Sequence, residues 1–354
     1  GMSPGSDTAN LAVMGYDPAV YYSGRSPFEA ISIGLTLADD DVTFRTNVVT
    51  LSDDEPYEEK VMLDHSADEI TTAEARVLIE EVNKRLGTGN FSFYPGVSYR
   101  HILVWNHAPF DFQLTPPHDI IGRKIKDYLP AGPYGDIFLK MMRASNEFLP
   151  EHPINKDRVA RGLKPANSVW IWGEGKRPAL SSFYDKYKLK GSVISAVDLI
   201  KGLGICAGLE SIDVEGATGN IHTNFAGKAR AALQELQRGQ DFVYIHFEAP
   251  DESGHRYEIE NKVKSMEYID SQVVKPIIEG LQAMGEDYSV LLLPDHPTPL
   301  SLRTHTAEPV PYLIYRSTDA QEKPGQVYDE AYAAQTGIYI AEGYRLMDRF
   351  LQRD

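Results

Sequence analysis

A short run of strand-forming residues that ends in an acid and an imidazole constrains the fold more than any other part of the chain. Residues 242–247 are rich in aromatic and β-branched side chains, and Pro250 and Gly254 then indicate the end of regular structure. Asp251 and His255 are therefore predicted to lie on a loop at the carboxyl end of a strand. Ligands of open α/β sheets bind at that edge. A carboxylate with an imidazole is a ligand set for divalent metals.

The second half of the chain alternates strand-like and helix-like segments. Such alternation is typical of a parallel sheet with helices on both faces. The expected segments are 192–196, 198–202, 212–215, the helix 226–238, the strand 242–247, the helix 260–284 and the strand 289–293.

The middle of the chain has a different pattern. Strands with a helix between them indicate an α+β unit. The expected strands are 42–51, 91–94 and 98–105, and the expected helices are 72–86 and 136–149. With 354 residues, the chain is long enough for two domains or for one large domain with an insertion.

Composition excludes several classes of protein. A formal charge of −16 argues against broad binding of nucleic acid or anionic membranes, which requires a basic surface. No run of about 18 apolar residues and no signal-peptide pattern is found. The single cysteine, Cys206, excludes an internal disulfide and is compatible with a reducing cytoplasm. We therefore expect a soluble cytoplasmic protein that binds small molecules, and leave the oligomeric state open, with a homo-oligomer as one option.

A serine near the amino terminus has two interpretations. Pro4 and Gly5 predict a turn, Ser6 is a favoured N-cap, and Gly15 is a plausible helix stop. Ser6 can be a helix cap and nothing more. Alternatively, its hydroxyl faces free backbone N–H groups, where a phosphorylated side chain can form and be held.

A second acid–imidazole pair follows the strand 289–293. Asp295 and His296 come directly after it, and His305 lies in the next loop. Each pair alone is more often a structural hydrogen bond. Together with Asp251 and His255, however, they supply five ligand-type side chains, which could bind two divalent ions beside Ser6 as a nucleophile.

Eight segments, in order along the whole chain, resemble one family. The chain is similar to the archaeal type of cofactor-independent phosphoglycerate mutase, a branch of the alkaline phosphatase superfamily. The resemblance is carried by PGSDTANL at Pro4, GYDP at Gly15, YSGRSPFEA at Tyr22, SYRH at Ser98, PPHD at Pro116, WIWG at Trp170, EAPDESGH at Glu248 and PDHPTP at Pro294.

The resemblance implies a reaction and a site. The family interconverts 3-phosphoglycerate and 2-phosphoglycerate in glycolysis and gluconeogenesis, through a phosphoserine intermediate and without 2,3-bisphosphoglycerate. Ser6 would carry the phosphoryl group. Asp251, His255 and His305 would hold one divalent metal, and Asp295 and His296 would hold another beside Ser6. Manganese, zinc, cobalt, iron or magnesium would suit these ligands.

The resemblance also implies an architecture. An alkaline-phosphatase-like α/β core, with a mainly parallel sheet flanked by helices, would comprise residues 1–39 and 173–354. A smaller inserted α+β cap would comprise residues 40–172 and exclude water from the site. The basic residues expected to grip the substrate are Arg25, Arg100, His118, Arg158, Arg161, Lys228 and Lys262.

One departure leaves alternatives open. The family pattern starts with a strand that ends in Asp-Gly, and that aspartate binds the metal shared with the serine. This sequence begins at the serine loop, so either it is a truncated or partly ordered version of a longer protein, which is the interpretation we favour, or its second metal site is impaired. In this form, the site at Asp251, His255 and His305 would fill while the Ser6 site would stay weak. A related phosphatase, another phosphomutase or a non-catalytic metal- or phosphate-binding protein stays possible on these residues.

Overall fold

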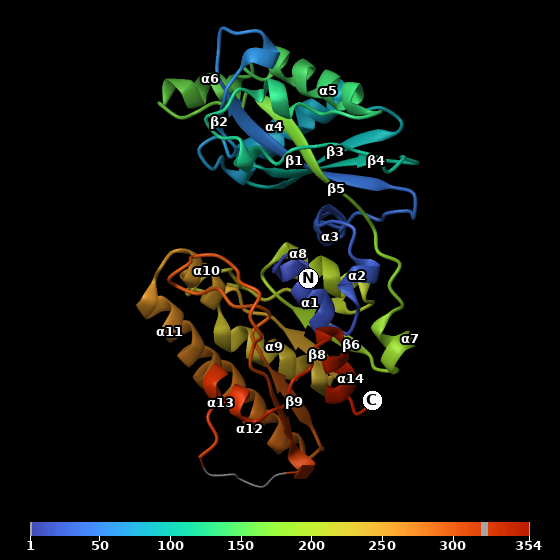
Figure 1. The fold of residues 1–354 in the computed structure, drawn as a ribbon, viewed down its shortest axis with the longest axis vertical. Helices are drawn as coiled ribbons and strands as arrows, with labels where there is room; N and C mark the ends of the chain where they lie inside the picture. Colours follow the sequence, from blue (N-terminus) through green and yellow to red (C-terminus); the bar gives the residue numbers. More distant parts are fainter. Residues whose placement is uncertain (1, 320–324, 354) are drawn as a thin grey trace. The chain divides into compact units, whose positions relative to one another are not determined.

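The computed structural model describes residues 2–319 and 325–353, and the chain divides into two compact units (Figure 1). Unit 1 comprises residues 1–22 and 178–354, and unit 2 comprises residues 23–177. The boundaries expected from the sequence lay at 39/40 and 172/173. Residues 23–39 belong to unit 2 because α3 (Ser26–Ser32) packs on its sheet, where the Ser26 hydroxyl donates to the Thr43 carbonyl oxygen at 3.0 Å.

Unit 2 is built on an antiparallel sheet in which β1 is central. β1 pairs with β4 and β5 along most of its length and with β2 at its end, and β3 pairs with β4. The helices of unit 2 are α3, α4 (Thr72–Leu86), α5 (Gly135–Phe148) and α6 (Pro153–Ala160), and its strands are β1 (Val42–Leu51), β2 (Met62–Asp64), β3 (Phe91–Val97), β4 (Arg100–Trp105) and β5 (Ser168–Lys176).

Helix α4 shows why these segments fold locally. Thr71 caps it by accepting from the backbone N–H of Glu74, and the Thr71 hydroxyl donates to the Glu74 carboxylate at 2.8 Å. Ala75, Leu78, Ile79 and Val82 are buried at helical spacing. The helix expected at 72–86 and the strand expected at 42–51 are confirmed.

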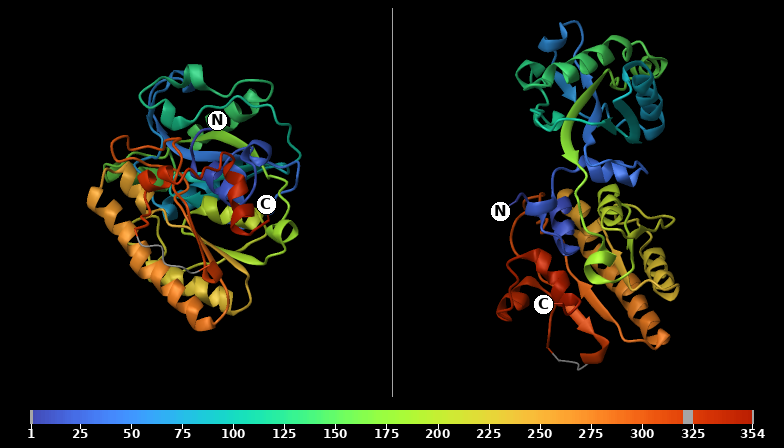
Figure 2. Two further views of the ribbon diagram at one scale, coloured as in Figure 1. Left: turned by 60° about the horizontal axis from the view of Figure 1, so that its bottom comes forward. Right: turned by 90° about the vertical axis from the view of Figure 1, so that its right-hand side faces the viewer.

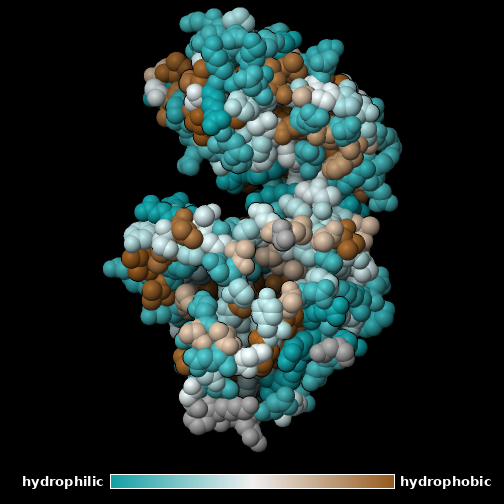
Figure 3. Space-filling model, viewed as in Figure 1, coloured by the Kyte–Doolittle hydropathy of each residue, from teal (hydrophilic) through white to brown (hydrophobic). Residues whose placement is uncertain are grey.

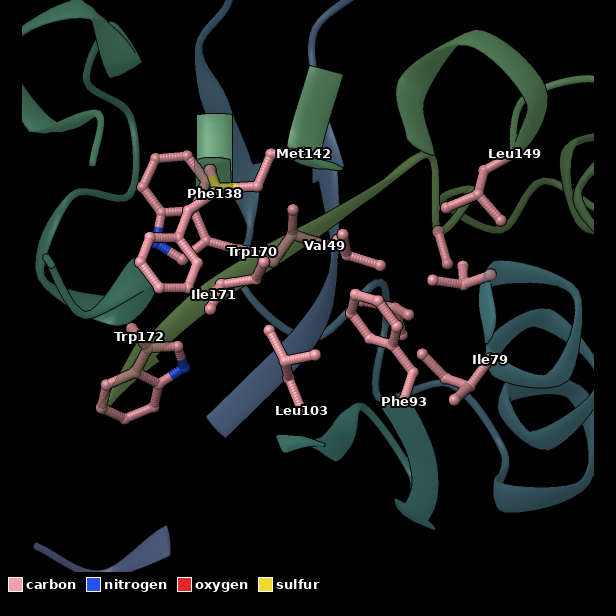
Figure 4. Close-up of a cluster of buried hydrophobic side chains, with 14 of the residues drawn as sticks. Val49, Ile79, Phe93, Leu103, Phe138, Met142, Leu149, Trp170, Ile171 and Trp172 are labelled. Carbon is pink, nitrogen blue, oxygen red and sulfur yellow. The ribbon is translucent and has the colours of Figure 1, made fainter. Parts of the chain in front are cut away.

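The hydrophobic core of unit 2 lies between the sheet and the helices α4 and α5 (Figure 4). The rings of Phe44 of β1 and Phe138 of α5 are in contact, with centroids 4.9 Å apart and planes tilted by 56°, and Leu103 of β4 is fully buried. Side chains of a strand alternate between its faces, so Arg45 and Asn47 of β1 point away from Phe44. The opposite face of the sheet is therefore polar, and α3 packs there (Figure 1).

Unit 1 contains a parallel sheet of three strands, in the order β7-β6-β8, and a separate antiparallel pair, β9 and β10. Its strands are β6 (Gly191–Ile194), β7 (Glu210–Ser211), β8 (Phe242–Ile245), β9 (Ser289–Leu292) and β10 (Leu313–Arg316). Its helices are α1 (Ser6–Val13), α2 (Pro18–Tyr21), α7 (Phe183–Tyr187), α8 (Asp198–Cys206), α9 (Phe225–Gln237), α10 (Ala249–His255), α11 (Ile259–Tyr268), α12 (Lys275–Met284), α13 (Glu330–Gln335) and α14 (Leu346–Phe350).

Three local predictions for unit 1 were wrong. Asp251 and His255 lie on a helix, α10, because Pro250 in the first turn fits a helix start and does not end the structure. Ser6 is the first residue of α1, with Gly5 as the N-cap, and its side chain makes no cap bond. The strand expected at 212–215 is limited to Glu210–Ser211. By contrast, the long helix expected at 260–284 is confirmed: α11 and α12 continue into one another through a π-helical turn, Ile269–Val274, and Figure 2 draws them as one long helix.

The visible surface of both units is mainly hydrophilic (Figure 3). One group of hydrophobic side chains gathers over α11, where Ile259, Val263 and Met266 are half exposed. In the described part of the chain, no helix combines the length and the apolar composition that a membrane span requires.

The core of unit 2 yields a stability prediction. Leu103→Ala removes a fully buried side chain and is expected to lower the free energy of unfolding by about 2–5 kcal/mol. All three tryptophans, Trp105, Trp170 and Trp172, belong to unit 2, so tryptophan fluorescence during urea denaturation reports on this unit. Val77→Ala, at a site 43% exposed, is the control and should change the value by less than about 0.5 kcal/mol. Equal effects of the two substitutions would contradict the assignment of the core.

A buried histidine predicts a pH dependence. Burial lowers the pKa of His101 to about 3, and its Nδ1 accepts from the Gly96 N–H at 2.9 Å. An unfolded chain takes up a proton near pH 6.5 and the folded chain does not, so this contribution to stability is complete above about pH 6.5 and falls by about 1.4 kcal/mol per pH unit below it. His101→Asn keeps an acceptor without titrating. The variant should lose less stability than the parent between pH 7 and pH 5, measured by the same fluorescence, and equal losses would refute the prediction.

Candidate functional site

Asp251, His255 and His305 converge in unit 1. Asp251 and His255 are four residues apart on α10, which places both on one face of the helix. Their ligand-type atoms and that of His305 all lie within 4.8 Å of one another. His305 Nε2 is 3.0 Å from Asp251 Oδ1 and 3.1 Å from His255 Nε2. The structure therefore brings together the first set of residues that the sequence singled out.

Backbone carbonyl groups orient the imidazoles of this cluster. Nδ1 of His255 lies 2.9 Å from the Arg303 carbonyl oxygen, and Nδ1 of His305 lies 3.2 Å from that of Pro4. A carbonyl oxygen only accepts, so each Nδ1 donates, and in a neutral imidazole Nε2 then has its lone pair available for a cation. The Nε2 lone pairs of His255 and His305 and the carboxylate of Asp251 are then directed toward one another. This arrangement fits a cation, and carbonyl groups behind ligand histidines are common at metal sites.

Ser6 belongs to a second cluster beside the first. Its hydroxyl lies 3.0 Å from Nε2 of His296, and Asn10, one turn further along α1, donates to the Ser6 carbonyl oxygen at 2.8 Å. The same Asn10 amide is 2.9 Å from Asp295 Oδ2, and Tyr244 of β8 donates to Asn10 Oδ1 at 2.6 Å. Ser6, Asp295 and His296 could therefore hold a second ion.

The two clusters are in contact and are supported by the same loop and helix residues. The rings of His296 and His305 have centroids 3.8 Å apart. Thr298 donates to Asp251 Oδ1, and Lys262 donates to the carbonyl oxygens of Pro250 and Thr298 at 3.0 Å each. A Cβ on Gly254 would lie 2.6 Å from the Thr298 carbonyl oxygen, so α10 approaches this loop as closely as only glycine permits. Lys262 thus supports the site from behind.

Burial and charge both act on the titratable groups. Burial by itself would raise the pKa of Asp251, but the Thr298 hydrogen bond and the nearby imidazoles hold that pKa below its ordinary value. Burial lowers the pKa of His246 to about 4 and that of Lys228 to about 8. Lys228 is 1% exposed and donates to the His246 carbonyl oxygen at 3.0 Å. Its ammonium group is occupied by the backbone here.

The other basic residues singled out from the sequence lie in unit 2 and fall into two groups. Arg25, Arg100 and His118 are exposed or partly exposed and lie on the polar side of the sheet. Arg158 is 2% exposed and bonds to the Glu74 carboxylate and to the carbonyl oxygens of Lys164 and Ala67, which favours a structural role. Arg161 pairs with Glu74 and Asp157 on the surface.

Several residues of the site were not singled out in the sequence. Asn10 lies four residues beyond Ser6, and Thr298 lies two residues beyond His296. This closeness in sequence to predicted site residues is the signal that could have identified them. Tyr244 lies on β8 and reaches the site only through Asn10. Arg45 of β1, close to Arg25 and Arg100, had no local motif that distinguished it.

Comparisons with known proteins agree on one family. Residues 1–155 match the family described as 2,3-bisphosphoglycerate-independent phosphoglycerate mutase. Proteins of that name from Methanothrix thermoacetophila and Methanosarcina barkeri are 48% and 45% identical, over 98% of this chain and 86% of each relative. A solved structure, the cofactor-independent phosphoglycerate mutase from Thermoplasma acidophilum, superposes with a TM-score of 0.63 at 25% identity, over 98% of this chain and 86% of that one.

Proposed function

The chain belongs to the 2,3-bisphosphoglycerate-independent phosphoglycerate mutase family, and we propose that Ser6 is the residue that carries the phosphoryl group in its reaction. The enzyme is an isomerase that interconverts 3-phosphoglycerate and 2-phosphoglycerate without 2,3-bisphosphoglycerate.

The observation that supports Ser6 is its position between two sets of ligand-type side chains. Its hydroxyl is bonded to His296, and the neighbouring Pro4 carbonyl oxygen accepts from His305 of the other cluster. The serine loop is thereby tied to both clusters. The positive end of the helix dipole at the start of α1 also favours negative charge.

The proposed reaction proceeds in two transfers. In the first, a bond forms between Ser6 Oγ and phosphorus as the bond between phosphorus and O3 of the substrate breaks, and the Ser6 proton ends on O3 in the net balance. In the second, O2 of the retained glycerate takes the phosphoryl group, and Ser6 regains its proton. Asn10 holds the Ser6 loop and Asp295 in a common position throughout, which keeps the reacting oxygen in place.

Divalent metal ions fit the donor set of the site. Asp251, His255 and His305 would hold one ion, and Ser6, Asp295 and His296 would hold the other. When bound, such ions would lower the pKa of the Ser6 hydroxyl and offset the negative charge of the phosphoryl group in transit. Manganese, zinc, cobalt, iron and magnesium are all compatible with carboxylate and imidazole ligands.

The architecture supports a division of roles between the units. We assign unit 1, which has a parallel sheet and carries Ser6 and both clusters, as the alkaline-phosphatase-like catalytic domain. Unit 2 is the proposed cap. Its exposed cationic side chains Arg25, Arg100 and His118 are the proposed contacts for the anionic substrate, since guanidinium groups bind carboxylate and phosphate in a planar, bidentate manner.

The role of Ser6 is tested by substitution. Ser6→Ala should abolish mutase turnover, because no oxygen remains to accept the phosphoryl group, while calorimetric titration with Mn²⁺ should still show binding at the Asp251 cluster. Ser3→Ala, at an exposed position of the same loop, should keep full turnover. Mass spectrometry of the quenched parent enzyme should show one added phosphoryl group, absent from Ser6→Ala. Persistent turnover of Ser6→Ala would reject the proposal.

The support of Asp251 by Thr298 predicts an effect on metal affinity. Thr298→Val keeps the shape of the side chain but removes the donor to Asp251, and should weaken Mn²⁺ binding by about 10–100-fold in calorimetric titration. Thr318→Val, at an exposed position of unit 1, is the matched control and should bind as the parent does. Unchanged affinity in Thr298→Val would contradict a metal at Asp251.

A further inference from the structure

Lys228 places a positive charge in the interior of unit 1. The residue lies in the first turn of α9 and is 1% exposed. Burial lowers its pKa to about 8, which leaves most of the side chain charged at pH 7. Taking a charge out of water is costly unless other groups compensate for it. The groups around this ammonium therefore indicate what the fold gains by burying it.

These groups all belong to one short segment, residues 246–248, which connects β8 to α10. The ammonium nitrogen of Lys228 donates to the His246 carbonyl oxygen at 3.0 Å. It also lies 4.5 Å from the centre of the Phe247 ring, within the range of a cation–π interaction. The negative charge of Glu248 opposes the fall of the Lys228 pKa, so this carboxylate attracts the ammonium. Each residue of the connection thus interacts with the same positive charge.

Two further contacts fix the connection. Ser195, the residue directly after β6, is 3% exposed, and its hydroxyl lies 3.0 Å from Nδ1 of His246. Phe225 of α9 stacks on Phe247 with ring centroids 5.5 Å apart and planes 10° apart. Phe225 and Lys228 are three residues apart and lie on one face of α9. Helix α9 therefore holds the connection through a ring and a charge at once.

The connection leads directly into the first metal-type cluster. Glu248 is the N-cap of α10, and Asp251 is the third residue of that helix. With seven residues, α10 is too short to be stable without tertiary contacts, so its placement depends on what holds its ends. The contacts of Lys228 hold the amino-terminal end. They thereby set the position of Asp251 relative to His305, which comes from a different loop.

We propose that Lys228 is a positioning residue for the metal cluster of Asp251, His255 and His305, and that it acts by fixing the connection of residues 246–248. This inference rests on the proposed function, which places a divalent ion at this cluster. The role differs from the phosphate contact expected from the sequence, because the ammonium is directed at the His246 carbonyl oxygen and the Phe247 ring. Groups behind metal ligands typically change metal affinity by about 10–100-fold when they are removed.

Calorimetric titration of the full chain with Mn²⁺ tests this role. Lys228→Met keeps the length of the side chain without its charge and should weaken Mn²⁺ binding by about 10–100-fold. Circular dichroism during urea denaturation of the metal-free proteins should give nearly equal midpoints, because the lost hydrogen bond is offset by no longer burying a charge. Lys275→Met, at a surface lysine of α12 that is 70% exposed, is the matched control and should bind as the parent does.

A second variant reaches the connection from β6. Ser195→Ala removes the contact with His246 Nδ1 and should also weaken Mn²⁺ binding, by a smaller factor than Lys228→Met because it removes one neutral hydrogen bond. This change is small enough to keep the fold. If Lys228→Met did not fold, Ser195→Ala would decide the matter, and unchanged affinity in that variant would overturn the inference.

Kinetics separate this role from substrate binding and from the proposed function. Turnover of Lys228→Met should recover as Mn²⁺ is raised, with the KM of the parent for 3-phosphoglycerate at saturating Mn²⁺. A raised KM under these conditions would make Lys228 a substrate contact and overturn the inference, as would unchanged Mn²⁺ affinity. A lowered urea midpoint that accompanies the weaker binding would assign Lys228 to stability alone. If the parent bound Mn²⁺ without turnover, the proposed function would fail, and the titrations would still decide the role of Lys228.

Discussion

The site depends on one constraint, the orientation of its imidazoles by backbone carbonyl oxygens. His255 and His305 direct their lone pairs toward Asp251 because their opposite nitrogens are committed to the carbonyl groups of Arg303 and Pro4. Without a positive charge among them, these three acceptors would repel one another. A cation relieves that repulsion, and the Pro4 contact extends the arrangement to the loop that carries Ser6. The proposed metal ligands and Ser6, the proposed nucleophile, are therefore held in one network.

In unit 2, the two faces of one sheet differ in their environment and in their role. One face packs Phe44 and Leu103 against α4 and α5 and holds the unit together. The other carries Arg45, which is largely buried against Trp172 and Glu29, with Arg25 and Arg100 nearby. Alternation of side chains along β1 is what allows a rigid core and a charged surface to share the same strand. A charged group on a packed strand is held more firmly than one on a loop.

The sequence predicted well wherever the information was local or lay within a motif. The helix expected at 72–86 was found, with its buried residues at helical spacing, and the strand at 42–51 was also found. The metal-type residues do meet, as their motifs indicated. The errors had local causes as well, since Pro250 supports a helix start as readily as it ends a strand, and the sequence could not distinguish these. Arg158 was chosen by its charge, and its burial became visible only in three dimensions.

The sequence by itself determined the family, the reaction and the identities of the acid, imidazole and serine side chains, because motifs record which chemical groups are present and in what order. Only the tertiary structure decided which nitrogen of each imidazole faces a carbonyl oxygen, which residue supports Asp251, and which arginine lies above Trp172. These features depend on contacts between residues far apart in the chain, such as His305 with Pro4. Hydrogen bonds and ring stacking act over a few ångströms of space, whatever the separation along the sequence.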